Sequence, residues 1–349
     1  MGKKEGIHPS ELRRDMVSGE WVVIATGRGR RPRDFASLPS PPVANPIEEC
    51  PFETLDEENA TLLVTLEGSI GAPKELPKSQ RGQWFVQSFQ NKYPAFSPHT
   101  KCPSPEKVGP HERIDGVGFH EVMVTRPHDR SIAEMCLPEI VALVRAYRAR
   151  MSILARELCI EYISILHNHG PLSGASVNHP HSQLIAIPVV PPDIYRSLVG
   201  SQRYYESEKR CVHCVLIEFE LSDGKRVIFE NEQFVVLCPF ASHAAFEIRI
   251  FPKHHASRFE LMPDNMSRLF AESLHAALAR LSVGLNNPSY NFFIHTAPAK
   301  TAENYEHYHW HLEILPKTAI WGGFEFGTGI EITTVAPEDA ADFFRSVKI

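Results

Sequence analysis

The stretch His179-Pro180-His181-Ser182-Gln183, followed by Leu184-Ile185-Ala186-Ile187-Pro188, is the most informative part of this sequence. Its apolar half is short and ends at a proline, which predicts a β-strand on which residues two apart share a face. His179, His181 and Gln183 are therefore expected to project to one side. A neutral imidazole is a nucleophile and an amide N–H can bond a phosphoryl oxygen, so the pattern favours a phosphate site. A metal site and two hydrogen-bonded surface histidines are the alternatives.

The order of strands and helices around this stretch is predicted to occur twice. Strand patterns at 84–89 and 120–125, a helix at about 139–158 and a strand at 160–166 precede the histidines. A strand at 246–251, a helix at about 265–283 and strands at 290–294 and 307–316 repeat this order. Five pairs of identical residues are separated by 128 positions: Tyr162 and Tyr290, His167 and His295, His179 and His307, His181 and His309, Pro188 and Pro316.

This repetition indicates a duplicated architecture. The sequence predicts an α+β protein of two histidine-rich lobes, each an antiparallel sheet with a packed helix. The lobes are expected at residues 10–195 and 196–349. Residues 56–80 lack a clear period and are interpreted as a surface excursion, and residues 189–207 are interpreted as a linker.

Composition limits the classes of function. The 349 residues are 43% hydrophobic and 22% charged, as in soluble globular proteins, and the net charge of −6 argues against nucleic acid as the main partner. Because no apolar segment approaches the length of a membrane span and residues 1–9 lack a signal-peptide core, a cytoplasmic protein without a membrane partner is expected. Seven cysteines, an odd number, favour a reduced compartment with metal ligands over a disulfide framework.

Six motifs together carry a resemblance to a known family. They are Glu20-Trp21-Val22-Val23-Ile24, Arg28 with Arg31 and Pro32, Asn91-Lys92-Tyr93-Pro94-Ala95, Gly118-Phe119-His120-Glu121, His179-Pro180-His181-Ser182-Gln183, and Gly322-Gly323-Phe324-Glu325-Phe326-Gly327-Thr328-Gly329. The chain resembles the galactose-1-phosphate uridylyltransferase family of the histidine-triad superfamily, and within it the plant-type ADP-glucose phosphorylase branch. The resemblance covers nearly the whole chain.

The family implies a double displacement. His181 would attack the α-phosphorus of a nucleoside-diphosphate sugar, the sugar 1-phosphate would leave, and a second phosphorylated acceptor would take the nucleotide from His181. Gln183 would bond the phosphoryl oxygens. The residues implied in substrate binding are Arg28, Arg31, Asn91, Asn168, Gly174, Ser176 and Glu325. Glu325 would act in the active site of a neighbouring subunit, since the family implies a homodimer. Without the family match, the two arginines would be read as a solvated basic loop.

Two metal sites are expected, with zinc as the ion. In the first lobe, the metal-binding pattern that the family implies falls on Cys50, Glu53, His128 and His179. Glutamate replaces the second cysteine of that pattern. The alternative is a lone core cysteine beside a surface glutamate. The second lobe offers Cys211, Cys214, His255 and His309, a stronger signal for structural zinc. His254 and His307 are alternates: by the offset of 128, His307 corresponds to His179, and His311 takes the place of Gln183. Cys102, Cys136, Cys159 and Cys238 lack paired spacing and are expected to pack.

Four functions remain open at this point. The leading hypothesis is a nucleotidyltransferase that moves UMP from UDP-glucose to a hexose 1-phosphate, and the close alternative is an ADP-sugar phosphorylase that moves AMP from ADP-glucose to phosphate. Gly327-Thr328-Gly329 favours the phosphorylase branch, as does the lack of the galactose enzymes' glutamine after Glu325. The other classes are a non-catalytic zinc-stabilised nucleotide-binding protein and a histidine-triad hydrolase. The intact pair His181 and Gln183 argues against both.

Overall fold

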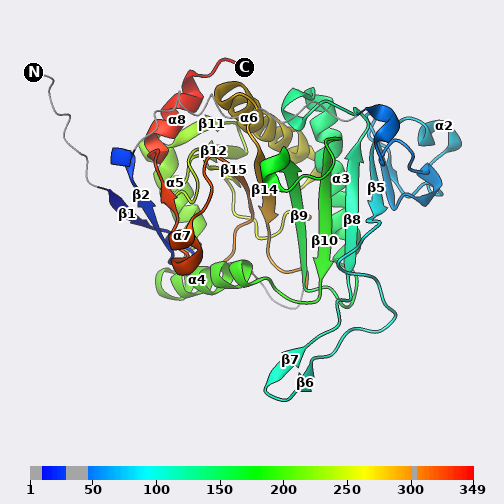
Figure 1. Cartoon of the computed structure of the whole chain (residues 1–349), viewed down its shortest axis with the longest axis horizontal. Coiled ribbons are helices and arrows are strands. Elements are labelled where there is room, and N and C mark those ends of the chain that lie inside the picture. Colours follow the sequence, from blue (N-terminus) through cyan, green and yellow to red (C-terminus); the bar gives the residue numbers. More distant parts are fainter. Residues whose placement is uncertain (1–9, 29–45, 301–304) are drawn as a thin grey trace, which may run out of the picture.

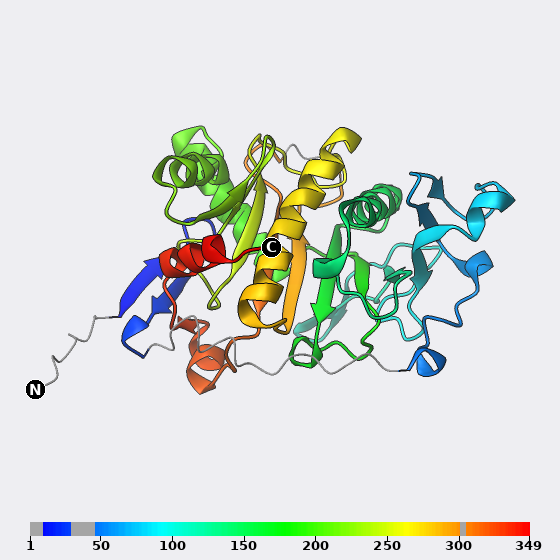
Figure 2. The ribbon, with the colours of Figure 1, turned by 90° about the horizontal axis from the view of Figure 1, so that it is seen from above.

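The computed structural model describes residues 10–28, 46–300 and 305–349, and its main feature is one large antiparallel sheet with two long helices on one face (Figures 1 and 2). The first lobe supplies six strands: β3 (Leu62–Thr65), β4 (Ile70–Gly71), β5 (Trp84–Gln90), β8 (Phe119–Thr125), β9 (Tyr162–His169) and β10 (His181–Ile187). The second lobe supplies five: β11 (Val227–Glu230), β12 (Phe234–Leu237), β13 (Ile248–Pro252), β14 (Tyr290–His295) and β15 (His311–Pro316).

The strand order is β11-β12-β13-β15-β14-β9-β10-β8-β5-β3-β4, with every neighbour antiparallel. The two lobes meet where β14 pairs with β9, from Tyr290 opposite His169 to Ile294 opposite Ile165. This confirms the predicted α+β fold with antiparallel lobes and adds that the two sheets are continuous. The lobe boundary at residues 195 and 196 stays a prediction, and it falls inside a helix.

Two long helices cover one face of this sheet. α3 (Leu137–Leu154) and α6 (Ser267–Leu285) lie side by side on it (Figure 2). In β10, Ser182, Leu184 and Ala186 are buried toward the helices, whereas Gln183, Ile185 and Ile187 are half-buried on the other face. Because side chains alternate along a strand, the helices fix which residues of β10 stay accessible. The histidine stretch therefore presents His181 and Gln183 on the face opposite α3 and α6.

Two segments differ from their sequence interpretation. Residues 56–80 are not only a surface excursion, because β3 runs through them as a fully buried strand of the main sheet. A short strand buried on both faces has no alternation to reveal it. Residues 189–207 are not a linker without structure, because α4 (Pro192–Glu208) occupies them. The predicted helices are found, with α3 starting earlier and ending earlier than expected.

Shorter elements complete the described chain. β1 (Glu11–Arg14), β2 (Trp21–Ile24) and β16 (Ile332–Thr333) form a small second sheet. β6 (Glu106–Val108) and β7 (His111–Arg113) form a hairpin that extends from the body (Figure 1). The remaining helices are α2 (Lys78–Arg81), α5 (Val212–Asp223), α7 (Gly323–Thr328) and α8 (Pro337–Ser346). None of the described helices is long and apolar enough to cross a membrane, and a cytoplasmic location stays a prediction.

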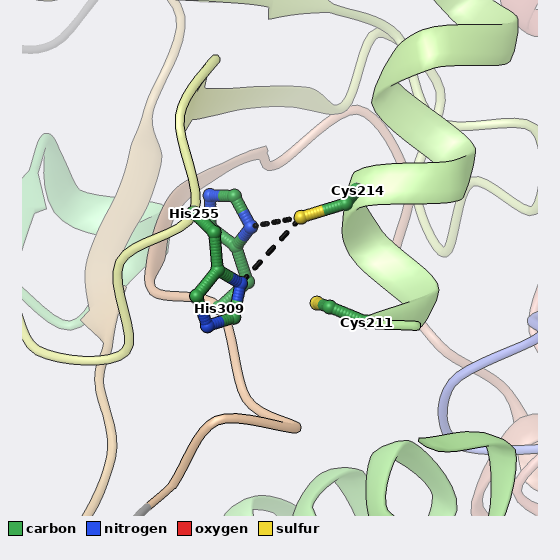
Figure 3. A group of neighbouring side chains, drawn as sticks. All are labelled: Cys211, Cys214, His255 and His309. Atoms are coloured by element: carbon green, nitrogen blue, oxygen red, sulfur yellow. Dashed lines mark hydrogen bonds between the residues drawn. The ribbon is translucent and has the colours of Figure 1, made fainter. Parts of the chain in front are cut away.

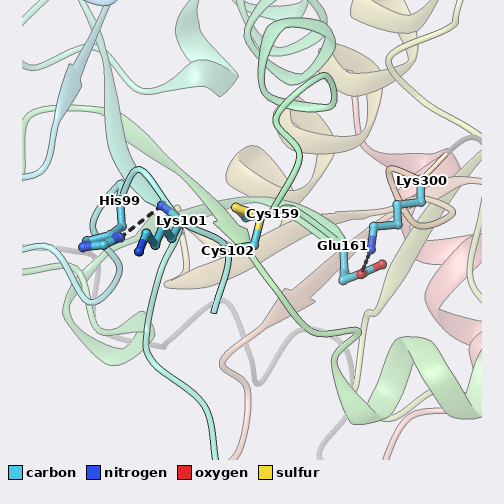
Figure 4. Close-up of a disulfide and its surroundings, with 6 residues drawn as sticks. All are labelled: His99, Lys101, Cys102, Cys159, Glu161 and Lys300. Carbon is cyan, nitrogen blue, oxygen red and sulfur yellow. Dashed lines mark hydrogen bonds and ion pairs between the residues drawn. A yellow bond between two sulfur atoms is a disulfide. The ribbon is translucent and has the colours of Figure 1, made fainter. Parts of the chain in front are cut away.

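Cys102 and Cys159 form a disulfide, which corrects the expectation that both only pack (Figure 4). The two cysteines are 57 positions apart, so no local motif reveals the pair. Cys102 is exposed in the segment that leads to the β6–β7 hairpin, and Cys159 is half-buried between α3 and β9. Of the other unpaired cysteines outside the metal groups, Cys238 is buried as expected, and Cys136 is exposed just before α3.

Candidate active site

His181 is the first residue of β10, and its ring is held in one tautomer. Its Nδ1–H donates to the carbonyl oxygen of His179 at 2.8 Å, so the lone pair is on Nε2. The side chain is largely buried, with 8% of the residue exposed. Burial lowers the pKa of His181 more than the bond to His179 raises it, which keeps the imidazole neutral near pH 7. Nε2 is therefore an available nucleophile.

Gln183 lies on the same face of β10 as His181, because the two are separated by one residue. Its Oε1 is 2.9 Å from Nε2 of His120, on the neighbouring strand β8. On the opposite face, Ser182 bonds the hydroxyl of Tyr147 from α3 and lies 3.1 Å from Nδ1 of His167. The strand that carries the two functional residues is thus hydrogen-bonded on both faces.

The glycine loop before β10 has the backbone conformation that phosphate binding uses. Gly170 and Gly174 have φ of 77° and 85°, in the region that favours glycine, and a Cβ on Gly174 would meet no heavy atom within 4 Å. Ser176 follows as an exposed residue. Asn168, near the end of β9, accepts a hydrogen bond from Nδ2 of Asn291 at 2.7 Å. Gly174 and Ser176 therefore lie in an open loop that leads into β10.

The other expected substrate residues are spread more widely. Asn91 follows β5 and its Nδ2 lies 3.2 Å from Nε2 of His120, so it belongs to the Gln183 neighbourhood. Arg28 is the last residue of a short 3-10 helix, Thr26–Arg28. Arg31 lies outside the described residues. Glu325 is in α7, where its Oε2 accepts a hydrogen bond from the Gly322 N–H at 2.9 Å.

The structure does not bring Glu325 to His181 within one chain. Phe326 of α7 lines a cavity of about 270 Å³ together with Leu315, near the end of β15. In the sheet, β14 and β9 stand between β15 and β10. Figures 1 and 2 show α7 on the second-lobe side of the molecule, away from β10. A role for Glu325 beside His181 therefore requires a second subunit, as the family resemblance implies.

Cys50, Glu53, His128 and His179 form the first candidate metal group, with one donor atom of each within 4.8 Å of the others. Nε2–H of His179 donates to the carbonyl of Thr125 at 2.6 Å, which leaves the lone pair on Nδ1. That Nδ1 is 3.5 Å from Cys50 Sγ and 3.3 Å from Glu53 Oε1. A carbonyl that fixes the far nitrogen is the usual arrangement around a metal-binding histidine. Glu53 thus stands where a second cysteine is expected.

Cys211, Cys214, His255 and His309 form the second group, with the same spread of donor atoms (Figure 3). Nε2–H of His309 donates to the carbonyl of Pro252 at 3.0 Å, and Cys214 Sγ is 3.5 Å from Nδ1 of His309 and of His255. Hydrogen bonding from Cys214 lowers the pKa of the Cys211 thiol, while burial opposes this. Two thiols and two imidazole nitrogens converge here, a donor set that suits zinc.

These contacts correct the predicted register of the duplication. His309 and His311 repeat the bonds of His179 and His181: each first histidine donates to a carbonyl across the sheet, and Nδ1 of each second histidine bonds the carbonyl of the first. The offset here is 130, from 179 to 309 and from 181 to 311. His309, not His307, is therefore the counterpart of His179, and Glu313, not His311, takes the place of Gln183. Connections of unequal length shift the register between the lobes.

The second-lobe histidine is paired differently from His181. Nε2 of His311 lies 3.1 Å from Oε1 of Glu313, and the same carboxylate oxygen is 3.1 Å from Nε of Arg249. His295, His311 and Glu313 also have donor atoms within 4.8 Å of one another. The two nitrogens of His311 thus both face oxygen acceptors, so this imidazole is not placed as a nucleophile.

Sequence reasoning assigned no role to two residues that touch the site. The ring of Phe52, between Cys50 and Glu53, lies 5.0 Å from the ring of His181 and 5.7 Å from that of His179, measured between centroids. His120 was noted as part of a motif, but its contact with Gln183 depends on the pairing of β8 with β10. No local pattern encodes either contact.

Comparison with known proteins identifies the family. Residues 72–191 match the N-terminal domain of galactose-1-phosphate uridyl transferase. An ADP-glucose phosphorylase of Arabidopsis thaliana is 36% identical over 343 residues, which are 97% of this chain and 93% of that protein. The chain belongs to the galactose-1-phosphate uridylyltransferase family. It is accordingly an enzyme of the nucleotidyltransferase class, and the resemblance noted in the motifs is confirmed.

One further relative and one solved structure are similar to this chain over almost its whole length. A galactose-1-phosphate uridylyltransferase of Thermotoga maritima is 27% identical over 350 residues, which are 97% of this chain and 99% of that protein. The crystal structure of an Arabidopsis thaliana ADP-glucose phosphorylase with bound ADP-glucose has a TM-score of 0.76 at 32% identity. It covers 98% of this chain and 100% of its own. The fold and the plant ADP-glucose phosphorylase branch are therefore both supported.

Proposed function

We propose that this nucleotidyltransferase works through a covalent nucleotidyl-His181 intermediate. The observation that carries the proposal is the hydrogen bond from Nδ1–H of His181 to the His179 carbonyl, which leaves the Nε2 lone pair free to attack phosphorus. A bond forms between Nε2 and the α-phosphorus of a nucleoside-diphosphate sugar while the bond to the bridging oxygen breaks. Sugar 1-phosphate leaves with that oxygen. An acceptor phosphate oxygen then attacks the same phosphorus, and His181 is released.

The surrounding residues supply donors to the phosphoryl group. Gln183 is placed to bond the oxygens of the intermediate from the same face of β10. The backbone around Gly174, the Ser176 hydroxyl and the Asn168 side chain are assigned to the phosphates, and Asn91 to the nucleotide. Arg28 and Arg31 are assigned to the phosphates as planar cations. Each of these roles comes from the family motif together with the position of the residue along the chain.

The substrate we favour is an ADP-sugar with inorganic phosphate as acceptor. This reverses the order of the sequence-based hypotheses, because an ADP-glucose phosphorylase matches at 36% identity and a uridylyltransferase at 27% over similar lengths. The Gly327-Thr328-Gly329 segment, which forms the end of α7 and its αL cap at Gly329, supports the same branch. Transfer of UMP from UDP-glucose to a hexose 1-phosphate is the second candidate. A homodimer is part of the proposal, since Glu325 cannot reach His181 otherwise.

Zinc is proposed at both groups of donors. The residues fit the ion because each site holds a histidine whose Nε2 proton is bonded to a carbonyl and whose Nδ1 faces a sulfur atom. A bound zinc would act structurally, by fixing chain segments that are distant in sequence. At the first site it would hold Cys50 and Glu53 and so keep Phe52 against His181.

Exchange of isotope tests the two-step reaction. The enzyme is incubated with ADP-glucose and labelled glucose 1-phosphate, without inorganic phosphate. If a covalent intermediate forms, label should appear in ADP-glucose, because the first half-reaction is reversible on its own. His181→Asn should abolish the exchange. Exchange that requires inorganic phosphate would contradict the proposal, and steady release of AMP without any acceptor would favour a hydrolase instead.

A further inference from the structure

His120 lies beside Gln183 because of how β8 and β10 pair. His120 is directly opposite Ile185 in the antiparallel ladder, and Gln183 is two residues from Ile185. Directly opposed residues and residues two apart share a face, so His120 and Gln183 are diagonal neighbours on the face opposite α3 and α6. The histidine is buried, with 8% of the residue exposed. Its contacts are therefore with the protein rather than with bulk water.

The protonation of the His120 ring follows from its neighbours. The backbone N–H of Ala95 donates to Nδ1 at 3.1 Å, and since a backbone N–H only donates, Nδ1 carries no proton. The ring hydrogen is then on Nε2, which lies 2.9 Å from Oε1 of Gln183. Nδ2 of Asn91 is 3.2 Å from the same nitrogen, but Asn91 Oδ1 already accepts from the Tyr93 N–H at 2.9 Å. The Nε2 proton therefore goes to the Gln183 carbonyl oxygen.

This bond decides which end of the Gln183 amide faces the substrate. A primary amide has an oxygen and an NH₂ of nearly the same size, and rotation by half a turn exchanges them. With Oε1 bonded to His120, the NH₂ group is left to point away from His120. If the amide were reversed, two N–H groups would face each other and a carbonyl oxygen would face the anionic phosphoryl group, which is repulsive.

We propose that His120 is a positioning residue that holds the Gln183 amide with its N–H groups toward the phosphoryl group. The inference rests on the proposed nucleotidyl-His181 chemistry and adds a residue to it. His120 also accepts from the Ala95 N–H through Nδ1, so the same ring joins the segment that follows Asn91 to the phosphoryl donor. The orientation is thereby set before the substrate binds, and no reorganisation is needed in the transition state.

A matched pair of substitutions separates the two bonds of His120. In His120→Asn the side-chain oxygen takes the place of Nδ1 and can accept from Ala95, but no donor reaches Gln183. In His120→Gln the amide reaches as far as Nε2 and can donate to Gln183. The rate of nucleotidyl-enzyme formation, measured by rapid quench at saturating ADP-glucose, should fall about 10- to 100-fold in His120→Asn, while the loss in His120→Gln should be within about 3-fold. KM should change little in either variant.

A double-mutant cycle distinguishes an effect of His120 on the Gln183 amide from a general loss of structure. In a Gln183→Ala background there is no amide to orient, so His120→Asn should have almost no further effect on the rate. Equal losses in His120→Asn and His120→Gln, or the same loss with and without Gln183, would overturn the inference. If wild-type protein forms no nucleotidyl adduct at all, the proposed function fails instead. If it forms one and His120→Asn forms it equally fast, only the role of His120 fails.

Discussion

Gln183 and Glu313 occupy equivalent positions in the two lobes, and the difference between them is consistent with the proposal that the first lobe carries the chemistry. The Gln183 amide is neutral and has N–H groups to offer to a phosphoryl oxygen, whereas the Glu313 carboxylate only accepts and lies against the Nε2 atom of His311. Glu313 is also tied to the buried guanidinium of Arg249. The residue at this position therefore differs between His181, which is proposed as the nucleophile, and His311, which is held by a carboxylate.

Placing the second-lobe residue in the first lobe should remove activity. Gln183→Glu puts a carboxylate two residues from His181, where it offers no N–H and repels the phosphoryl oxygens. Nucleotidyl transfer should fall by more than the roughly 10²- to 10³-fold that removal of one oxyanion donor alone costs. Gln183→Ala is the control and should lose less, because it adds no charge. A Gln183→Glu enzyme as active as the alanine variant would contradict this explanation.

At the scale of elements, distant segments are tied to the sheet by sulfur chemistry. The disulfide fastens the segment before the β6–β7 hairpin to the turn before β9. An ion bound at each candidate metal group would likewise fasten the chain around Cys50 to the residues before β10, and the start of α5 to the residues before β15. Each tie joins residues that have no regular hydrogen bonds to the main sheet. The framework of strands therefore holds the loops of the site through a few side chains.

The disulfide should contribute stability in oxidising buffer. Closing a loop of this length restricts the unfolded chain, and Cys102→Ser is expected to lower the free energy of unfolding by about 2–4 kcal/mol. Urea unfolding of both proteins measures the difference. With a dithiol reductant the two proteins should unfold at similar urea concentrations. An equal difference with and without reductant would mean that packing, not the bond, is responsible.

The two metal groups should respond separately to substitution. Cys214→Ser removes a ligand of the second group, so the zinc content of purified protein should fall by about one ion per chain. Glu53→Cys restores two thiols in the first group and should slow the release of zinc to a chelator, because thiolates are strong zinc ligands. Elemental analysis and a colorimetric release assay measure these effects. Unchanged zinc content in Cys214→Ser would exclude that site.

Over the whole molecule, sequence patterns predicted the parts that depend on local periodicity. β10, the helices α3 and α6, and the repeated order of elements follow from spacing that each segment carries within itself. β3 was missed because its four buried residues do not alternate. The Cys102–Cys159 bond, the register of 130 and the His120–Gln183 contact were missed because they depend on pairings between distant segments. The family pattern supplied the first candidate metal group, and the Cys-x-x-Cys spacing with two histidines indicated the second.

Intact mass after incubation with nucleotide sugar tests the central claim most directly. Wild-type protein and His181→Ala are each incubated with ADP-glucose and, in parallel, with UDP-glucose. The account predicts one AMP on each wild-type chain, mapped to His181 and removed by inorganic phosphate, and no adduct on the variant. A UMP adduct in place of the AMP adduct would keep the chemistry of His181 and overturn the choice of ADP-sugar. No adduct from either substrate, with wild type and variant indistinguishable, would contradict covalent catalysis.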